Sequence, residues 1–172
     1  MLVRAATVHD AGVITTIYNQ TVVTSTATFD TEPKSAEDRA RWLSDRAARH
    51  PVLVAEQSGE VVGWGALSPY SDRTGYAATA EISVYVDERS LRRGIGRALS
   101  VALLEAAARE GLHSVLARIC TENVESVRMV RSLGFAEAGT MHEVGRKFDR
   151  WLDVVTWEYL VATPDAVSDG RP

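Results

Sequence analysis

The sequence predicts an α/β protein built on one mixed, mostly antiparallel sheet. Strand-like segments outnumber helical ones, and sequential strand pairs typical of hairpins occur toward both ends of the chain. In the middle, a strand at 79–86, a helix at 94–110 and a strand at 113–120 form one strand–helix–strand unit. Such a unit makes a right-handed crossover between parallel strands, and its single occurrence indicates a mixed sheet and not a repeated βαβ barrel.

About seven strands and four helices are expected in order along the chain. Apolar residues at helical spacing after Asp10 predict the first helix, which Asp10 can cap. Ser35 followed by Asp38 resembles a capping box, while Gly111 and Gly134 would end the third and fourth helices. The expected strands are 2–6, 51–57, 60–67, 79–86, 113–120, 135–144 and 152–161, and the later helices are 35–49, 94–110 and 123–133.

Length and composition indicate one folded domain, expected over residues 1–162, followed by a flexible tail at 163–172. Hydrophobic residues make up 45% of the chain and the net charge is −4, which argues against general binding to nucleic acid. Cys120 is the one cysteine, so no intramolecular disulfide can form. Without a signal-peptide pattern or an apolar run of roughly 18 residues, we expect a cytoplasmic protein with no membrane partner.

The segment 89–97, Arg-Ser-Leu-Arg-Arg-Gly-Ile-Gly-Arg, gathers four arginines and two glycines between a strand and a helix. The first N–H groups of a helix have no partner within it, and the helix dipole is positive there. Glycines let the backbone approach phosphate oxygens closely, and arginines add charge-assisted hydrogen bonds. The turn therefore predicts a site for a phosphorylated ligand, although a solvated arginine face at an ordinary helix start would give the same pattern. It lacks the Walker A ending and the third glycine of the dinucleotide fingerprint.

Two longer motifs resemble those of the GNAT superfamily of N-acetyltransferases. Val84-Tyr85-Val86 followed by the segment 92–99 is similar to motif A, and the run from Asn123 to Phe135 is similar to motif B. The segments 17–19, 28–33 and 143–151 resemble the phosphinothricin and methionine-sulfoximine acetyltransferase family more closely. The resemblance covers residues 2 to 160 and implies a GNAT fold, whose sheet is splayed at the centre.

The resemblance implies that the phosphorylated ligand is acetyl-CoA. Its pyrophosphate would lie on the N–H groups of the turn, and its pantetheine arm would pair with the strand as an added strand does. Leu91 departs from the family, which has a polar residue there, and Arg89 or Arg92 could compensate. The residues implied for the cofactor are Val84, Tyr85, Val86, Arg92, Arg93, Gly94, Ile95, Gly96, Arg97, Asn123, Ser126 and Ser132.

Glu81 is the candidate catalytic residue. An unpaired carboxylate inside an apolar strand is costly, and Glu81 matches a glutamate position of the family. Acetyl transfer to an amine requires the ammonium to lose a proton, which a carboxylate accepts directly or through water. The alternative is a strand glutamate that faces solvent or pairs with an arginine. Because Cys120 is typical of core packing and no other nucleophile is convincing, we expect direct transfer.

The acceptor is expected to be the amino group of a small amino acid or an analogue such as phosphinothricin. The resemblance implies substrate contacts from Phe29, Arg73, Thr74, Gly75, Tyr76 and Lys147. The segment 146–151 is either a solvated hairpin tip, part of the pocket, or a homodimer interface. His113 and His142 lack metal-ligand spacing, so no metal is expected. The alternatives left open are another amine, such as a protein N-terminus or a polyamine, and a non-enzymatic acyl-CoA sensor.

Overall fold

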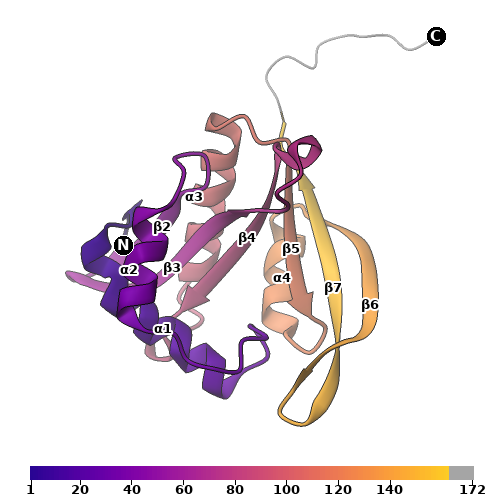
Figure 1. Cartoon of the computed structure of the whole chain (residues 1–172), viewed down its shortest axis with the longest axis horizontal. Helices are drawn as coiled ribbons and strands as arrows, with labels where there is room; N and C mark the ends of the chain where they lie inside the picture. The colour runs from indigo at the N-terminus through magenta and orange to yellow at the C-terminus, as the bar shows by residue number, and fades with distance from the viewer. Residues whose placement is uncertain (163–172) are drawn as a thin grey trace.

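The computed structural model describes residues 1–162, in which a seven-stranded sheet carries helices on both faces (Figure 1). The expected tail at 163–172 lies outside the described residues. The strands are β1 (Leu2–Ala5), β2 (Val52–Gln57), β3 (Glu60–Pro69), β4 (Thr79–Val86), β5 (Ser114–Cys120), β6 (Ala136–Lys147) and β7 (Arg150–Leu160). The α-helices are α1 (Ala11–Thr24), α2 (Ala36–Ser44), α3 (Ile95–Arg109) and α4 (Val124–Ser132). Within residues 1–162, no helix is both long and apolar enough to cross a membrane.

The strand order is β1-β2-β3-β4-β5-β7-β6, and every neighbouring pair is antiparallel except β4 and β5. That parallel pair is short, because only Thr79–Glu81 of β4 pair with Ser114–Leu116 of β5. Beyond Glu81 the two strands diverge toward their C-terminal ends (Figure 1). The expectation of a mixed, mostly antiparallel sheet splayed at its centre is therefore confirmed.

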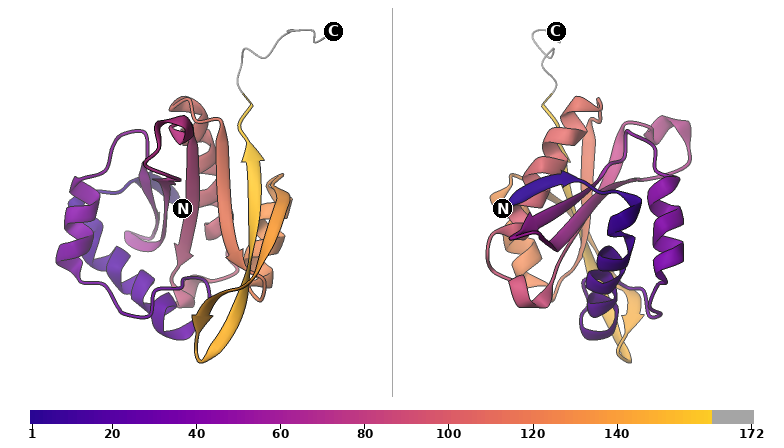
Figure 2. Two further views of the ribbon diagram at one scale, coloured as in Figure 1. Left: turned by 45° about the vertical axis from the view of Figure 1, so that its right-hand side comes forward. Right: turned by 90° about the vertical axis from the view of Figure 1, so that its left-hand side faces the viewer.

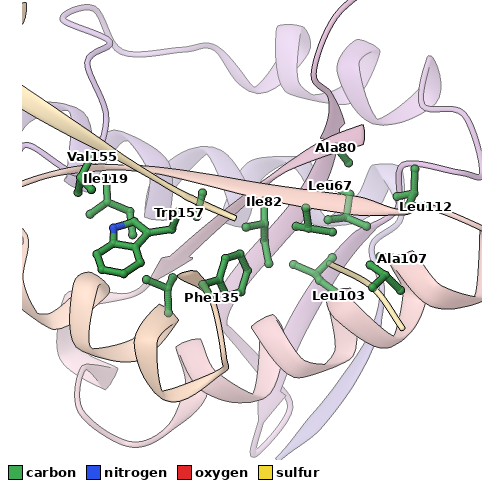
Figure 3. Close-up of a cluster of buried hydrophobic side chains, with 14 residues drawn as sticks. Leu67, Ala80, Ile82, Leu103, Ala107, Leu112, Ile119, Phe135, Val155 and Trp157 are labelled. Atoms are coloured by element: carbon green, nitrogen blue, oxygen red, sulfur yellow. The ribbon is translucent and has the colours of Figure 1, made fainter. Parts of the chain in front are cut away.

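Hydrophobic cores lie on both faces of the sheet. α1 and α2 cover one face and α3 and α4 the other, as the right-hand view of Figure 2 shows. The larger core lies between the sheet and α3 and α4, and includes Ile82, Leu103 and Trp157 (Figure 3). The second core packs Ile14 and Ile17 of α1 against β2 and β3. Burial of both sheet faces explains why the central strands are nearly continuous apolar runs.

Two helix expectations are corrected by the structure. The second helix ends at Ser44 and not near Arg49, because the Arg46 guanidinium reaches across to the carbonyl oxygens of His50 and Leu67. Asp10 precedes α1 but does not cap it. Its carboxylate instead accepts hydrogen bonds from Arg4 at 2.9 Å and from the Thr7 N–H at 2.7 Å, tying β1 to the start of α1. The Ser35 cap is confirmed, since the Ser35 hydroxyl accepts from the Asp38 N–H at 3.1 Å.

The last hairpin is longer than the sequence predicted. β6 continues to Lys147 and β7 begins at Arg150, so the turn consists of Phe148 and Asp149 alone. Both turn residues have positive φ, 51° and 58°, as a two-residue hairpin turn matched to strand twist requires. The hairpin tip thus extends beyond the end of β5, beside the end of the molecule where β4 and β5 separate (Figure 1).

Candidate active site

The open edge of β4 is the first part of the site. The Asp87 N–H donates to the Val62 carbonyl oxygen at 2.9 Å, which fixes the alternation of backbone groups along β4. The N–H and C=O groups of Tyr85 consequently face β3, whereas those of Val84 and Val86 face the gap left by β5. Two of the three expected strand residues therefore present unpaired backbone groups to that gap.

The basic turn lies at the same end of β4, between a 3-10 helix (Glu88–Ser90) and α3. Gly94, with φ of 79°, is the N-cap residue of α3, and no side chain caps the helix there. In the part of the chain that the structure describes, the N–H groups of residues 92–97 have no protein acceptor. The turn thus offers a row of N–H donors at a helix start, as an anion site needs.

Arg89, one of the two residues expected to compensate for Leu91, is engaged by a neighbouring carboxylate. Its guanidinium pairs with Asp87 at 2.9 Å, and that hydrogen bond holds the pKa of the Asp87 carboxyl below its usual value. Leu91 itself is exposed. Arg92 is also exposed and adopts φ of 59°, and no ion pair of its guanidinium occurs among residues 1–162.

A cavity fills the space where β4 and β5 separate. Val84, Tyr85, Asn123 and Ser126 line it, together with residues that the sequence did not single out. These additional residues are Ala27, Ile82, Ser83, Ser100, Ala117, Arg118, Ile119, Met129, Val130, Leu133 and Phe135. Cys120, which the sequence assigned to core packing, also lines the cavity. Ser100 lies one helical turn after Gly96 on α3, and this spacing could have indicated that Ser100 is near the phosphate turn. Its hydroxyl donates to the Gly96 carbonyl at 2.8 Å.

Two polar residues at the ends of α4 differ in whether they line the cavity. Asn123 caps the helix, because its side-chain oxygen accepts from the Ser126 N–H at 3.2 Å, and it also lines the cavity. Ser132 is exposed and its hydroxyl donates to the Met129 carbonyl at 2.8 Å. Ser132 is absent from the cavity lining, so the structure does not bring it to the other residues expected to hold the cofactor.

Glu81 stands at the last paired position before β4 and β5 separate. Its carboxylate, on a side chain that is 21% exposed, accepts a hydrogen bond at 2.6 Å from Arg118 of β5. This hydrogen bond raises the pKa of the Arg118 guanidinium. Arg118 also lines the cavity, and it was not singled out because its pairing with Glu81 depends on the register of two strands. The pairing with an arginine that was the alternative for Glu81 is therefore present, and it holds the carboxylate at the inner end of the gap.

The residues expected to bind the acceptor fall into two groups. Arg73 precedes a short exposed 3-10 helix (Thr74–Tyr76) that leads into β4, at the Glu81 end of that strand. Phe29 and Lys147 lie near the opposite end, where the β6–β7 hairpin turns. The structure brings Phe29 and Lys147 together but does not bring them to residues 73–76.

Lys147 is buried and holds the loop between α1 and α2. It is 4% exposed, and its ammonium donates to the carbonyl oxygens of Ser25 and Thr28, both at 2.8 Å. Burial lowers the pKa of Lys147. The solvated hairpin tip considered for this segment therefore does not describe Lys147, whose charge is directed to the backbone of the loop that carries Phe29. Phe29 packs directly on Gly145 of β6.

A second cavity, of about 370 Å³, lies on the α1 and α2 face of the sheet. Ser83 and Tyr85 of β4 line both cavities, so the two spaces meet along one strand. The rings of Trp64 and Tyr85 stack with centroids 4.8 Å apart. Burial raises the pKa of Tyr85 to about 12, so this phenol is protonated at neutral pH.

Comparison with known proteins agrees with this arrangement. The family model described as an acetyltransferase (GNAT) domain matches residues 3–156. The chain belongs to the GNAT acetyltransferase family. This GNAT acetyltransferase is 39% identical to a phosphinothricin N-acetyltransferase of Streptomyces coelicolor, over 91% of the chain and 94% of that relative. It is 38% identical to an L-methionine sulfoximine/L-methionine sulfone acetyltransferase of Pseudomonas aeruginosa, over 87% and 91%.

Solved structures give the same result for the fold. An acetyltransferase of Salmonella typhimurium, determined with its cofactor acetyl-CoA, superposes on this GNAT acetyltransferase with a TM-score of 0.91. The two chains are 35% identical, and the match covers 97% of this chain and 99% of that one. No group of three metal-ligating side chains that could hold an ion occurs in residues 1–162.

Proposed function

We propose that this protein transfers an acetyl group from acetyl-CoA to the amino group of a small amino acid or an analogue. The relatives act, by their names, on phosphinothricin, methionine sulfoximine and methionine sulfone, and these are the proposed acceptor types. The observation that carries the proposal is the unpaired backbone edge at Val84 and Val86, which leads from a row of helix-start N–H groups to a carboxylate at Glu81.

The cofactor residues have distinct proposed tasks. The N–H groups of residues 92–97 hold the pyrophosphate, with Arg92, Arg93 and Arg97 adding positive charge. Val84 and Val86 pair with the amides of the pantetheine arm as a neighbouring strand would. The side-chain nitrogen of Asn123 donates to that arm while its oxygen keeps the helix cap. The open shape of the sheet supports this proposal, because a paired β5 would occupy the same donors.

The chemistry needs few groups, because acetyl-CoA supplies an already activated acyl group. Glu81 accepts the proton of the acceptor ammonium, directly or through water, so that the neutral amine can attack the thioester carbon. The carbon–sulfur bond then breaks, and CoA leaves as a thiolate that takes up a proton from water. Arg118 keeps the carboxylate in one orientation. A backbone N–H of the open β4 edge polarises the thioester carbonyl. Holding both reactants across β4 provides the remaining rate enhancement through proximity.

An acceptor panel tests this function. Free thiol release from acetyl-CoA would be measured with methionine sulfone, methionine sulfoximine, phosphinothricin, a polyamine and an alanine-initiated peptide. The three amino acids are expected to be turned over at least ten times more efficiently than the polyamine or the peptide. Tight acetyl-CoA binding without turnover of any amine would instead identify a sensor.

Glu81→Gln separates catalysis from binding. The amide keeps the shape of the side chain but cannot accept the proton, so kcat is expected to fall about 100-fold or more at pH 7. The affinity for acetyl-CoA, measured by calorimetry, is expected to stay within about twofold, since Glu81 is not part of the proposed cofactor site. Glu105→Gln on α3 is a control for loss of one negative charge. Full turnover by Glu81→Gln would show that Glu81 is not the general base.

We also propose that the protein is a cytoplasmic homodimer. β6 is an edge strand of the sheet, and the exposed side chains of Met141, Val144, Phe148 and Trp151 place apolar surface on its hairpin. An exposed edge strand with apolar residues favours association. Light scattering coupled to size-exclusion chromatography should give a dimer mass for the native chain and a monomer mass for Trp151→Glu.

A further inference from the structure

A buried cation lies in the cavity on the α1 and α2 face. Arg39 of α2 is 9% exposed, and its guanidinium carbon lies 4.8 Å, 4.7 Å and 5.1 Å from the ring centroids of Tyr18, Trp42 and Trp64. Aromatic faces attract a guanidinium but do not satisfy its N–H donors. Burial lowers the pKa of Arg39.

The Arg39 guanidinium has no anionic partner of its own. Among the described residues, no hydrogen bond or ion pair to it is seen, and its Nε atom is buried without an acceptor. Both nearby carboxylates are already committed. Asp30 accepts from the Tyr18 hydroxyl at 2.7 Å and pairs with Lys34 at 3.0 Å. Asp38 accepts from Ser35 and pairs with Arg41.

A second guanidinium, that of Arg46, contacts the same tryptophan but does not line the cavity. Arg46 lies on the Trp42 ring at 4.6 Å, while Arg39 lies 4.7 Å from the same ring. Burial, and the charge of Arg39, lower the pKa of Arg46 to about 10. The Arg46 donors are used by the carbonyl oxygens of His50 and Leu67 and by the Ser68 hydroxyl. Arg39 is therefore the cation with free hydrogen-bonding capacity, in a chain whose net charge is −4.

The position of the cavity connects Arg39 to the proposed reaction. Ser83 and Tyr85 separate it from the cofactor cavity. Ser68, at its margin, is the direct cross-strand partner of Glu81. An acceptor in this cavity would have its amino group beside β4 and Glu81 and the rest of the molecule under α2.

We propose that Arg39 binds the carboxylate of the amino-acid acceptor and so makes the enzyme select amino acids over simple amines. The inference rests on the proposed acetyl transfer and names the group that recognises the acceptor. A guanidinium offers two parallel N–H donors that match the two oxygens of a carboxylate. The surrounding rings exclude water, which strengthens that pair, and they accommodate the apolar part of the acceptor.

The experiment compares methionine sulfone with the amine that lacks only its carboxylate, 3-(methylsulfonyl)propylamine. For the wild type, kcat/KM is expected to be about 100-fold higher for the amino acid, the effect of one buried charge-assisted pair. Arg39→Met keeps an unbranched chain for the aromatic contacts and removes the donors. It should lower kcat/KM for the amino acid about 100-fold and leave the value for the amine within about threefold, so that the preference disappears.

The same measurements distinguish a role of Arg39 in recognising the acceptor from a purely structural role. A purely structural Arg39 would cause equal losses for both acceptors, and that result would overturn the inference. Arg41→Met, the same change on the exposed side of α2, should leave the preference intact. If Arg39→Met does not fold, Arg39→Lys keeps the charge and should reduce the preference about tenfold. Equal use of both acceptors by the wild type would reject the inference while upholding acetyl transfer, and failure to acetylate any amine would reject the proposed function itself.

Discussion

Replacing Gly145 with alanine would force the Phe29 ring away from the sheet. A Cβ atom at this position would lie 2.8 Å from Cε2 and 3.0 Å from Cδ2 of Phe29, whereas carbon atoms rest at about 3.5–4.0 Å. The ring would have to retreat by roughly 0.7–1 Å. Its loop resists such movement, because Lys147 holds the carbonyl oxygens of Ser25 and Thr28, and Thr28 also contacts the Tyr18 hydroxyl.

The expected cost is that of overpacking, about 1–3 kcal/mol in the free energy of unfolding. For a chain of this length the melting temperature should fall by about 2–12 °C, measured by calorimetry or circular dichroism. In a Phe29→Leu background the same alanine should cost at least about 0.5 kcal/mol less, because a smaller side chain removes the overlap. Gly12→Ala is the control, since nothing lies within 4 Å of a Cβ there. An unchanged melting temperature for Gly145→Ala, or equal losses in both backgrounds, would refute the reasoning.

Three further outcomes are expected. Gly94→Asp should weaken acetyl-CoA binding at least 100-fold in calorimetry, because it places a carboxylate at the phosphate turn. Gly111→Asp is the control and should leave the affinity unchanged. Gly111 lies at the other end of α3 and has a similar left-handed backbone and open surroundings. Asp10→Asn should cost about 1–2 kcal/mol of stability at pH 7. The Arg4 hydrogen bond lowers the pKa of Asp10 from 3.8 to about 2. The stabilisation is therefore complete above pH 3.8 and is lost as the pH falls from 3.8 through 2. The free energies of unfolding of both proteins, measured by urea titration, should converge near pH 2, and a difference that does not change with pH would contradict this. Lys147→Met should reduce kcat/KM for the acceptor about tenfold by releasing the Phe29 loop, with acetyl-CoA affinity retained, whereas the exposed Arg146→Met should change neither.

Local patterns predicted the sheet and the helices because most of these elements bury a face. The helix and strand ends that were predicted wrongly depend on contacts with residues far away in the sequence. α2 stops at Ser44 because Arg46 bonds to Leu67, a residue that is 21 positions away. β6 was predicted too short because Gly145, Arg146 and Lys147 read as a charged hairpin tip, whereas Lys147 is buried through contacts with a distant loop.

The residues of the candidate site differ in the same way, because some have a local sequence signal and others depend on distant contacts. The phosphate turn, Glu81 and Asn123 were predictable because each carries its signal in adjacent residues or in a family motif. Arg118 was not, because its ion pair with Glu81 arises from the parallel register of β4 and β5. Lys147 was expected to contact the acceptor, and its burial by a loop more than a hundred positions earlier in the chain could not be predicted. Arg39 was not singled out, because it lies on a polar helix and two of the three rings around it come from other elements, Tyr18 from α1 and Trp64 from β3.

The separation of β4 and β5 also links folding to metabolism. A sheet with an unpaired interior edge lacks a set of backbone hydrogen bonds until the proposed cofactor supplies them, so the native state gains stability by mass action with acetyl-CoA. At a concentration 100 times the dissociation constant this gain is about 2.7 kcal/mol. A cell depleted of acetyl-CoA would thus hold a less stable, more readily degraded enzyme, and the abundance of the protein would follow the supply of its own acetyl donor.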